Sequence, residues 1–127
     1  MILKLVQRML DNSERSGPHR RVEKVLKKMG IGFISENDEF LPYKLDLYLP
    51  DYHAAIEVDG PSHSNKKDKA RDTWMLERYF VPTMRIRARG PWQSQDRLEK
   101  LILEFLTENS EDIEDRKIKW RTAYINA

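Results

Sequence analysis

Three acidic residues, Asp46, Glu57 and Asp59, have a spacing that would suit a site for a divalent cation. They lie in two short segments, KLDLYL (44–49) and AAIEVDG (54–60), in which apolar and polar residues alternate. Such alternation is typical of half-buried strands. The residues between the segments, PDYH (50–53), are typical of a turn. The two segments are therefore predicted to form a hairpin.

The register of this hairpin decides whether the acids meet. With the turn centred between Asp51 and Tyr52, Asp46 lies across from Glu57, and Asp59 shares their face with Lys44. Directly opposed side chains have Cβ atoms about 4.5–5.5 Å apart, so the like charges need a compensating cation. Mg²⁺ prefers oxygen ligands of this kind. The alternative is a solvent-facing hairpin in which Lys44 pairs with Asp59 and the other acids are hydrated. A one-residue slip would also separate the pair.

These residues resemble a known family. The pattern of Asp46, Glu57 and Asp59 on adjacent strands, followed by a helix, is similar to the core of the PD-(D/E)xK nucleases. The string IEVDGPSH (56–63) resembles more narrowly the group of very-short-patch-repair endonucleases and phage homing endonucleases. The homing branch has a signature called EDxHD, and the matching residues here are Glu23, Asp46, His63 and Asp68. The resemblance covers residues 18 to about 90.

The resemblance implies a metal-dependent DNA endonuclease, a hydrolase that nicks or cuts phosphodiester bonds and whose target could be a mismatch or a DNA structure. It implies Mg²⁺ as cofactor, with Mn²⁺ as a substitute, held by Asp46, Glu57 and Asp59. His63 would act as general acid or base. Asp59 occupies the position of the family's usual lysine, so the source of that positive charge stays open. The candidates are Lys44, Lys66, Lys67, Lys69 and His63.

Several of these residues also have ordinary structural interpretations. Glu23 is a common helix residue. Asp68 follows Asn65 with the spacing of a helix capping box. His63 could simply close the turn after Gly60. His19 and His53 receive no role.

Basic residues at the start of a helix over 65–79 are the candidates for phosphate contacts, because backbone N–H groups there also favour anions. These residues are Lys66, Lys67, Lys69 and Arg71. Arg85, Arg87 and Arg89 are expected to extend that surface from a strand over 83–88.

The periodicity predicts an α/β fold, a small mixed sheet flanked by helices, and the resemblance implies a restriction-endonuclease-like core. Residues 1–127 are predicted to form a single nuclease-like domain, with a core over about 18–108 and a C-terminal extension over 109–127. In that extension, Trp120 and Tyr124 predict a short docked helix. We expect helices over 2–11, 18–29, 65–79 and 95–108, strands near 33–35 and over 44–49, 54–60 and 83–88, and a turn at 36–38. The core contacts expected in the helix over 65–79 are Trp74, Leu76 and Tyr79 or Phe80.

Composition narrows the function further. The 127 residues include no cysteine, which excludes a disulfide scaffold, a thiolate zinc site and a cysteine nucleophile. No apolar run is long enough for a membrane span, and a cytoplasmic location is expected. The net charge of +2 is distributed in basic clusters, which suit either a phosphate backbone or solvated helix faces. The resemblance implies DNA as partner, with RNA less favoured. A homodimer or larger complex stays open. The competing functions are a non-catalytic nucleic-acid-binding module, similar to the RAP domain, and an interaction protein without chemistry.

Overall fold

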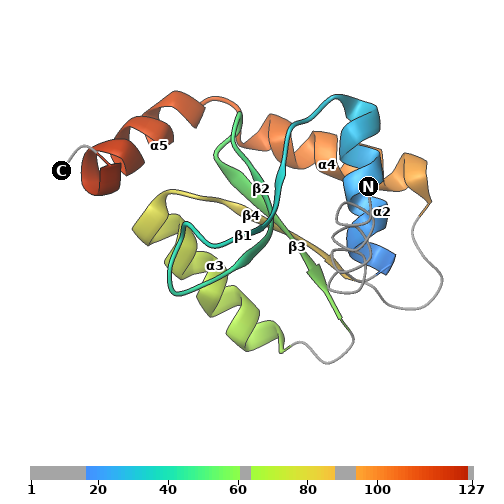
Figure 1. Cartoon of the computed structure of the whole chain (residues 1–127), viewed down its shortest axis with the longest axis horizontal. Coiled ribbons are helices and arrows are strands. Elements are labelled where there is room, and N and C mark those ends of the chain that lie inside the picture. Colours follow the sequence, from blue (N-terminus) through green and yellow to red (C-terminus); the bar gives the residue numbers. More distant parts are fainter. Residues whose placement is uncertain (1–16, 61–63, 88–93, 126–127) are drawn as a thin grey trace, which may run out of the picture.

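The computed structural model describes residues 17–60, 64–87 and 94–125, and these residues form a four-stranded sheet with helices on both faces (Figure 1). The expected α/β architecture, a small mixed sheet flanked by helices, is confirmed. The helix expected over 2–11 lies outside the described residues. The elements in chain order are α2 (Gly17–Met29), β1 (Ile34–Asn37), β2 (Leu45–Leu49), β3 (Ala54–Asp59), α3 (Asn65–Tyr79), β4 (Thr83–Arg87), α4 (Gln95–Glu108), α5 (Ile113–Trp120) and a π-helical turn, η1 (Arg121–Ile125).

The sheet has the order β1-β2-β3-β4. β1, β2 and β3 pair antiparallel, whereas β3 and β4 pair parallel. A parallel pair needs a crossover connection, and α3 supplies it. Leu47 lies opposite Ile56 and Leu49 lies opposite Ala54. The same register, continued by one residue, places Asp46 across from Glu57, as the turn position predicts.

Two apolar cores cover the two faces of the sheet. The first lies between the sheet and helices α2 and α4, and the second lies on the side of α3 and α5, in agreement with the arrangement in Figure 1. The buried residues of the first core are Val22, Val25, Leu26, Leu47, Leu49, Ile56, Ile86, Leu98, Ile102 and Leu106. Those of the second core are Phe40, Leu45, Tyr48, Ala55, Met75 and Val81.

Three local predictions are wrong. The predicted turn at 36–38 is partly strand, because β1 continues through Glu36 to Asn37, which pairs with Leu45. Leu76, predicted as a core contact of its helix, is 47% exposed, and Met75 is buried instead. The N-cap of α3 is Ser64, whose hydroxyl accepts a hydrogen bond from the Lys67 N–H, so Asn65 is already helical.

The C-terminal segment docks on the second core, as predicted from Trp120 and Tyr124. The Trp120 ring lies 4.7 Å from that of His53 and 5.4 Å from that of Phe40, centroid to centroid. The Arg116 guanidinium donates hydrogen bonds to several backbone carbonyls, which ties α5 to the β2–β3 turn; the acceptors are Tyr52, His53, Phe80 and Asn109. Among the described residues, no helix is long and apolar enough to span a membrane.

Candidate metal centre

Asp46 and Glu57 cross-link the ends of β2 and β3 through their carboxylates. The Glu57 Oε2 atom accepts a hydrogen bond from the Asp46 N–H at 3.3 Å, and Asp46 Oδ2 accepts one from the Val58 N–H at 2.8 Å. Each carboxylate therefore binds a backbone N–H of the opposite strand, just beyond the point where the backbone pairing of β2 and β3 ends at Leu47 and Ile56. The exchange holds the two side chains together on the same side of the hairpin.

The Glu57 carboxyl group is buried beside Asp46, which disfavours the charged form of Glu57. Glu57 is only 4% exposed. Burial, followed by the hydrogen bond to Asp46 and the charge of Asp46, raises the pKa of Glu57 to about 9. The Arg71 guanidinium, with Nη2 2.8 Å from Glu57 Oε1, lowers that pKa but does not offset the other effects. In the metal-free protein at neutral pH, we therefore assign the proton of this pair to Glu57.

Asp46 also belongs to a second group of possible metal ligands. His19 of α2, Glu36 of β1 and Asp46 of β2 offer ligand atoms that all lie within 4.8 Å of one another. Two ligands on opposite sides of an ion such as Mg²⁺ are about 4.2 Å apart, so small side-chain movements would close this set around an ion. His19 is buried, whereas Glu36 and Asp46 are partly exposed, so the site is open on its carboxylate side.

Glu36 reaches this site from an unusual backbone conformation. Its φ is +53°, in the left-handed region that a residue with a side chain rarely occupies. Such strain often accompanies functional sites, because the surrounding structure must hold it in place. The Glu36 carboxylate lies 3.8 Å from His19 Nδ1 and 3.5 Å from Lys44 Nζ. Lys44 therefore pairs with Glu36, and the alternative expectation that Lys44 pairs with Asp59 is wrong.

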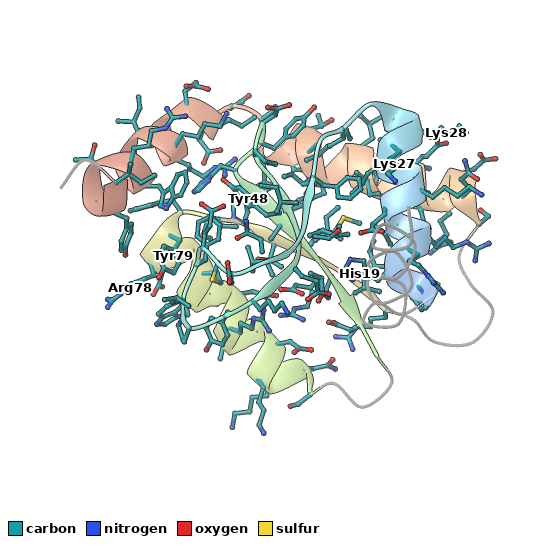
Figure 2. All side chains as sticks on the ribbon, in the orientation of Figure 1. His19, Lys27, Lys28, Tyr48, Arg78 and Tyr79 are labelled. Atoms are coloured by element: carbon teal, nitrogen blue, oxygen red, sulfur yellow. The ribbon has the colours of Figure 1, made fainter. Side chains whose placement is uncertain are left out.

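Glu23 approaches the ring nitrogen of His19 that does not face Glu36. Its Oε2 atom is 3.4 Å from His19 Nε2, one helical turn earlier, and it also accepts a hydrogen bond from the Ser35 hydroxyl. Figure 2 shows His19 near the start of α2, beside the sheet. A carboxylate on the remote ring nitrogen is the usual support of a metal-binding histidine, since it fixes the tautomer and the ring orientation.

The remaining predicted carboxylates form a separate network around Arg85. Arg85 binds Asp72 through two hydrogen bonds of 2.7 Å, and its Nη1 atom lies 2.7 Å from Asp59 Oδ1 and 3.4 Å from Asp68 Oδ1. Asp59 is 1% exposed and Asp68 is 8% exposed. The Asp68 side chain therefore faces β4 rather than forming the predicted capping box. Arg85, expected on an outer DNA-binding surface, is instead largely buried within this network.

The basic residues predicted to contact phosphate are partly exposed to solvent and partly directed into the fold. Lys66, Lys67 and Lys69 are exposed on the first turns of α3. Arg71 points inward, where Nη2 donates to Glu57 and to the Lys44 carbonyl, both at 2.8 Å. Its guanidinium also lies over the Tyr43 ring, 4.6 Å from the centroid. Arg71 therefore brings a positive charge into direct contact with Glu57 of the Asp46–Glu57 pair.

The structure therefore brings together Asp46 and Glu57, and joins Glu23 to them through His19. It groups Asp59 and Asp68 around Arg85, and His63 lies outside the described residues. Sequence reasoning missed His19 and Glu36. The spacing of His19 and Glu23, one turn apart on a helix, was a usable signal. Glu36 had no such signal, because its segment looked like a turn.

Comparisons with known proteins add little to this geometry. No protein-family model matches the chain, and no curated protein matches it significantly. Among solved structures, the catalytic domain of the homing endonuclease I-Bth0305I is similar, with 20% identity and a TM-score of 0.47. The match covers 87% of this chain and 99% of that domain. Similarity at this level supports no conclusion about fold or function.

Proposed function

We propose that the chain is a metal-dependent DNA endonuclease whose centre is Asp46. One observation carries the proposal: side chains of three separate elements, His19, Glu36 and Asp46, converge beside a buried carboxyl pair. Packing alone gives no reason to gather these groups, because each is costly to remove from water. A divalent cation would offset that cost, and Asp46, which belongs to both the ligand set and the carboxyl pair, would be its central ligand.

The donor set fits such an ion. Carboxylate oxygens suit Mg²⁺ and Mn²⁺, and an imidazole nitrogen favours Mn²⁺ or another transition metal. His19, Glu36 and Asp46 would hold the ion, with Glu57 as a neighbouring ligand once its proton is displaced. When bound, the ion would supply charge to a scissile phosphate and lower the pKa of a bound water. We expect Mg²⁺ to serve and Mn²⁺ to serve at least as well.

The other residues would then have supporting roles. Glu23 would orient His19 through Nε2, which makes it a positioning residue. Arg71 would stand in for the family's missing lysine, since it brings a positive charge to the Glu57 carboxyl group. Asp59 and Asp68 would hold Arg85 and fix β4 against α3, rather than binding the ion. His63 is retained as candidate general acid or base, and Lys66, Lys67 and Lys69 as phosphate contacts.

One observation favours the competing function, a nucleic-acid-binding module without catalysis. Arg71 already binds Glu57, and Arg85 already pairs with Asp59 and Asp68, so a chain that had lost its ion could remain stable. This alternative predicts DNA binding that does not depend on divalent ions and no cleavage.

A cleavage assay separates the two functions. Supercoiled plasmid and a mismatched duplex are incubated with the full chain and Mg²⁺, Mn²⁺ or EDTA, and the wild type is compared with Asp46→Asn. We expect cleavage that needs the ion and a loss in Asp46→Asn beyond the roughly 10–100-fold typical of an outer-shell partner. Asp51→Asn, an exposed acid in the β2–β3 turn, is the matched control and should cleave normally. Cleavage that survives in EDTA or in Asp46→Asn would contradict the proposal.

A further inference from the structure

α3 carries a basic surface that adjoins the ring of Trp74. Trp74 forms a wall shared by two hollows, of about 550 and about 480 Å³. Both volumes fall in the range of about 300–1,000 Å³ that is usual for ligand sites. The first hollow is lined by Tyr43, Lys67, Asp68, Ala70, Arg71 and Trp74. The second is lined by Lys66, Lys69, Ala70, Thr73, Trp74 and Glu77. We call the two hollows together the α3 groove.

Helical spacing explains why the groove exists. Lys66, Ala70 and Trp74 recur every four residues and so follow one stripe of α3. Ala70, the small residue between the two larger ones, leaves room on this stripe for a flat group beside the Trp74 ring. Lys67 and Arg71 flank the stripe on one side, and Lys69 flanks it on the other. The groove thus combines an aromatic wall with cations on both sides.

The aromatic wall extends to a second ring. Tyr43 meets Trp74 edge to face, with centroids 5.3 Å apart and an angle of 79° between the planes. Arg71 covers the Tyr43 ring and also contacts Glu57, 2.8 Å away. One side chain therefore joins the groove to the carboxyl pair beside the candidate metal centre. A strand lying in the groove would pass next to that centre.

We infer that the α3 groove binds unpaired nucleotides, so that the strand presented to the Asp46 centre is single-stranded or locally melted. This inference rests on the proposed function for its meaning, although it can be tested without cleavage. Phosphates of any nucleic acid would satisfy the lysines, but base faces are hidden by stacking within a duplex. Aromatic side chains beside a basic groove bind bases whose faces are exposed. Of the acids in the lining, Asp68 binds Arg85, and Glu77 bounds the far end of the second hollow.

Binding of labelled oligonucleotides to the full chain tests the inference. Fluorescence anisotropy in EDTA compares oligodeoxyuridylate and oligouridylate of about 12 nucleotides with a duplex of the same length. We expect either single strand to bind about tenfold more tightly than the duplex, and the ratio of the two strands shows which sugar is preferred. Equal or tighter binding of the duplex would overturn the inference.

Variants locate the binding on the groove. Trp74→Leu should weaken single-strand binding about fivefold or more, whereas Trp74→Phe, which keeps an aromatic face, should lose much less. Because Trp74 also packs against Tyr79, a second variant that avoids the core is needed. Lys66→Ala combined with Lys69→Ala should lower the salt dependence of binding by about 0.7 per lysine in the log–log slope. Lys27→Ala is the control, since Lys27 lies on α2 at the end opposite to His19 (Figure 2).

The outcomes distinguish the two proposals. Preferential single-strand binding that is lost in the groove variants supports the inference, even if the chain proves unable to cleave. Metal-dependent cleavage of duplex with no single-strand preference leaves the proposed function intact and overturns the groove. A lysine double variant that behaves like Lys27→Ala would also overturn it, whether or not Trp74→Leu folds.

Discussion

Asp46 and Asp59 lie in the same hairpin, yet their surroundings differ in the balance of charge. Around Arg85, one guanidinium answers Asp59, Asp68 and Asp72, with short and partly bidentate hydrogen bonds. Around Asp46, the buried Glu57 carboxyl group has a raised pKa, and His19 of α2 and Glu36 of β1 offer further ligand atoms. The first region resembles a structural ion-pair network, whereas the second gathers possible ligands of three elements around Asp46, with Arg71 in contact with Glu57. The role of an acidic residue therefore depends less on its type than on the charged side chains that surround it.

The largest expected effect is the loss of Arg85. Arg85→Met leaves Asp59 and Asp68 buried without their cation, which should lower the free energy of unfolding by about 3–5 kcal/mol. Urea denaturation monitored by circular dichroism measures this. Arg87→Met, an exposed arginine of the same strand, is the matched control and should change stability by less than about 0.5 kcal/mol. Similar stabilities for the two variants would mean that the Arg85 network does not hold β4 in place.

Removal of His19 should act on the ion rather than on the fold. His19→Gln deletes the imidazole ligand, and we expect Mn²⁺ binding, measured by calorimetry, to weaken beyond the roughly 10–100-fold that is typical of an outer-shell partner. Mg²⁺ binding should fall less, because Mg²⁺ prefers oxygen ligands. The exposed Lys24→Gln on the same helix serves as control. If His19→Gln keeps the wild-type preference between the two ions, His19 is not a ligand.

Glu57 should make the metal-free protein sensitive to alkali. Its folded pKa of about 9 lies above the ordinary value of 4.5, so its contribution to stability is fully present below about 4.5. That contribution is lost as the pH rises through the folded pKa. Urea midpoints in EDTA should therefore fall from pH 6 to pH 9 in the wild type, with a shallower fall in Glu57→Gln. Parallel curves would show that another group carries the dependence.

His53 should have a smaller effect of opposite sign. Tyr48 Oη lies 2.7 Å from His53 Nδ1, and the Tyr79 carbonyl lies 2.8 Å from Nε2. Burial lowers the pKa of His53 from 6.5 to about 4 despite the bond to that carbonyl. Between these two pH values His53 is protonated in the unfolded chain but neutral in the folded chain. The free energy of unfolding should therefore fall as the pH drops from 6.5 towards 4. An NMR titration, assigned with His53→Asn, that gives a pKa at or above 6.5 would contradict this.

Sequence patterns predicted most of the elements, and the failures cluster near the candidate site. The stripe of α3 that faces the sheet includes Asp68, Arg71 and Met75, so it is largely polar. Hydrophobic periodicity therefore gave the wrong phase and favoured Leu76, which is exposed. The turn expected at 36–38 failed for a related reason, since Glu36 adopts a left-handed conformation within a strand. Sites that need charge inside the fold violate the patterns on which such predictions depend.

The pairing of Asp46 with Glu57 follows from the sequence alone. Strict alternation and a short turn determine the register, and both are local features within about a dozen residues. Which cation serves which acid was decided only by tertiary structure. Arg71 and Arg85 approach the hairpin from α3 and β4, and His19 approaches from α2, at positions set by how these elements pack. Packing is a property of the whole chain, because the direction of a side chain depends on the helix or strand that carries it.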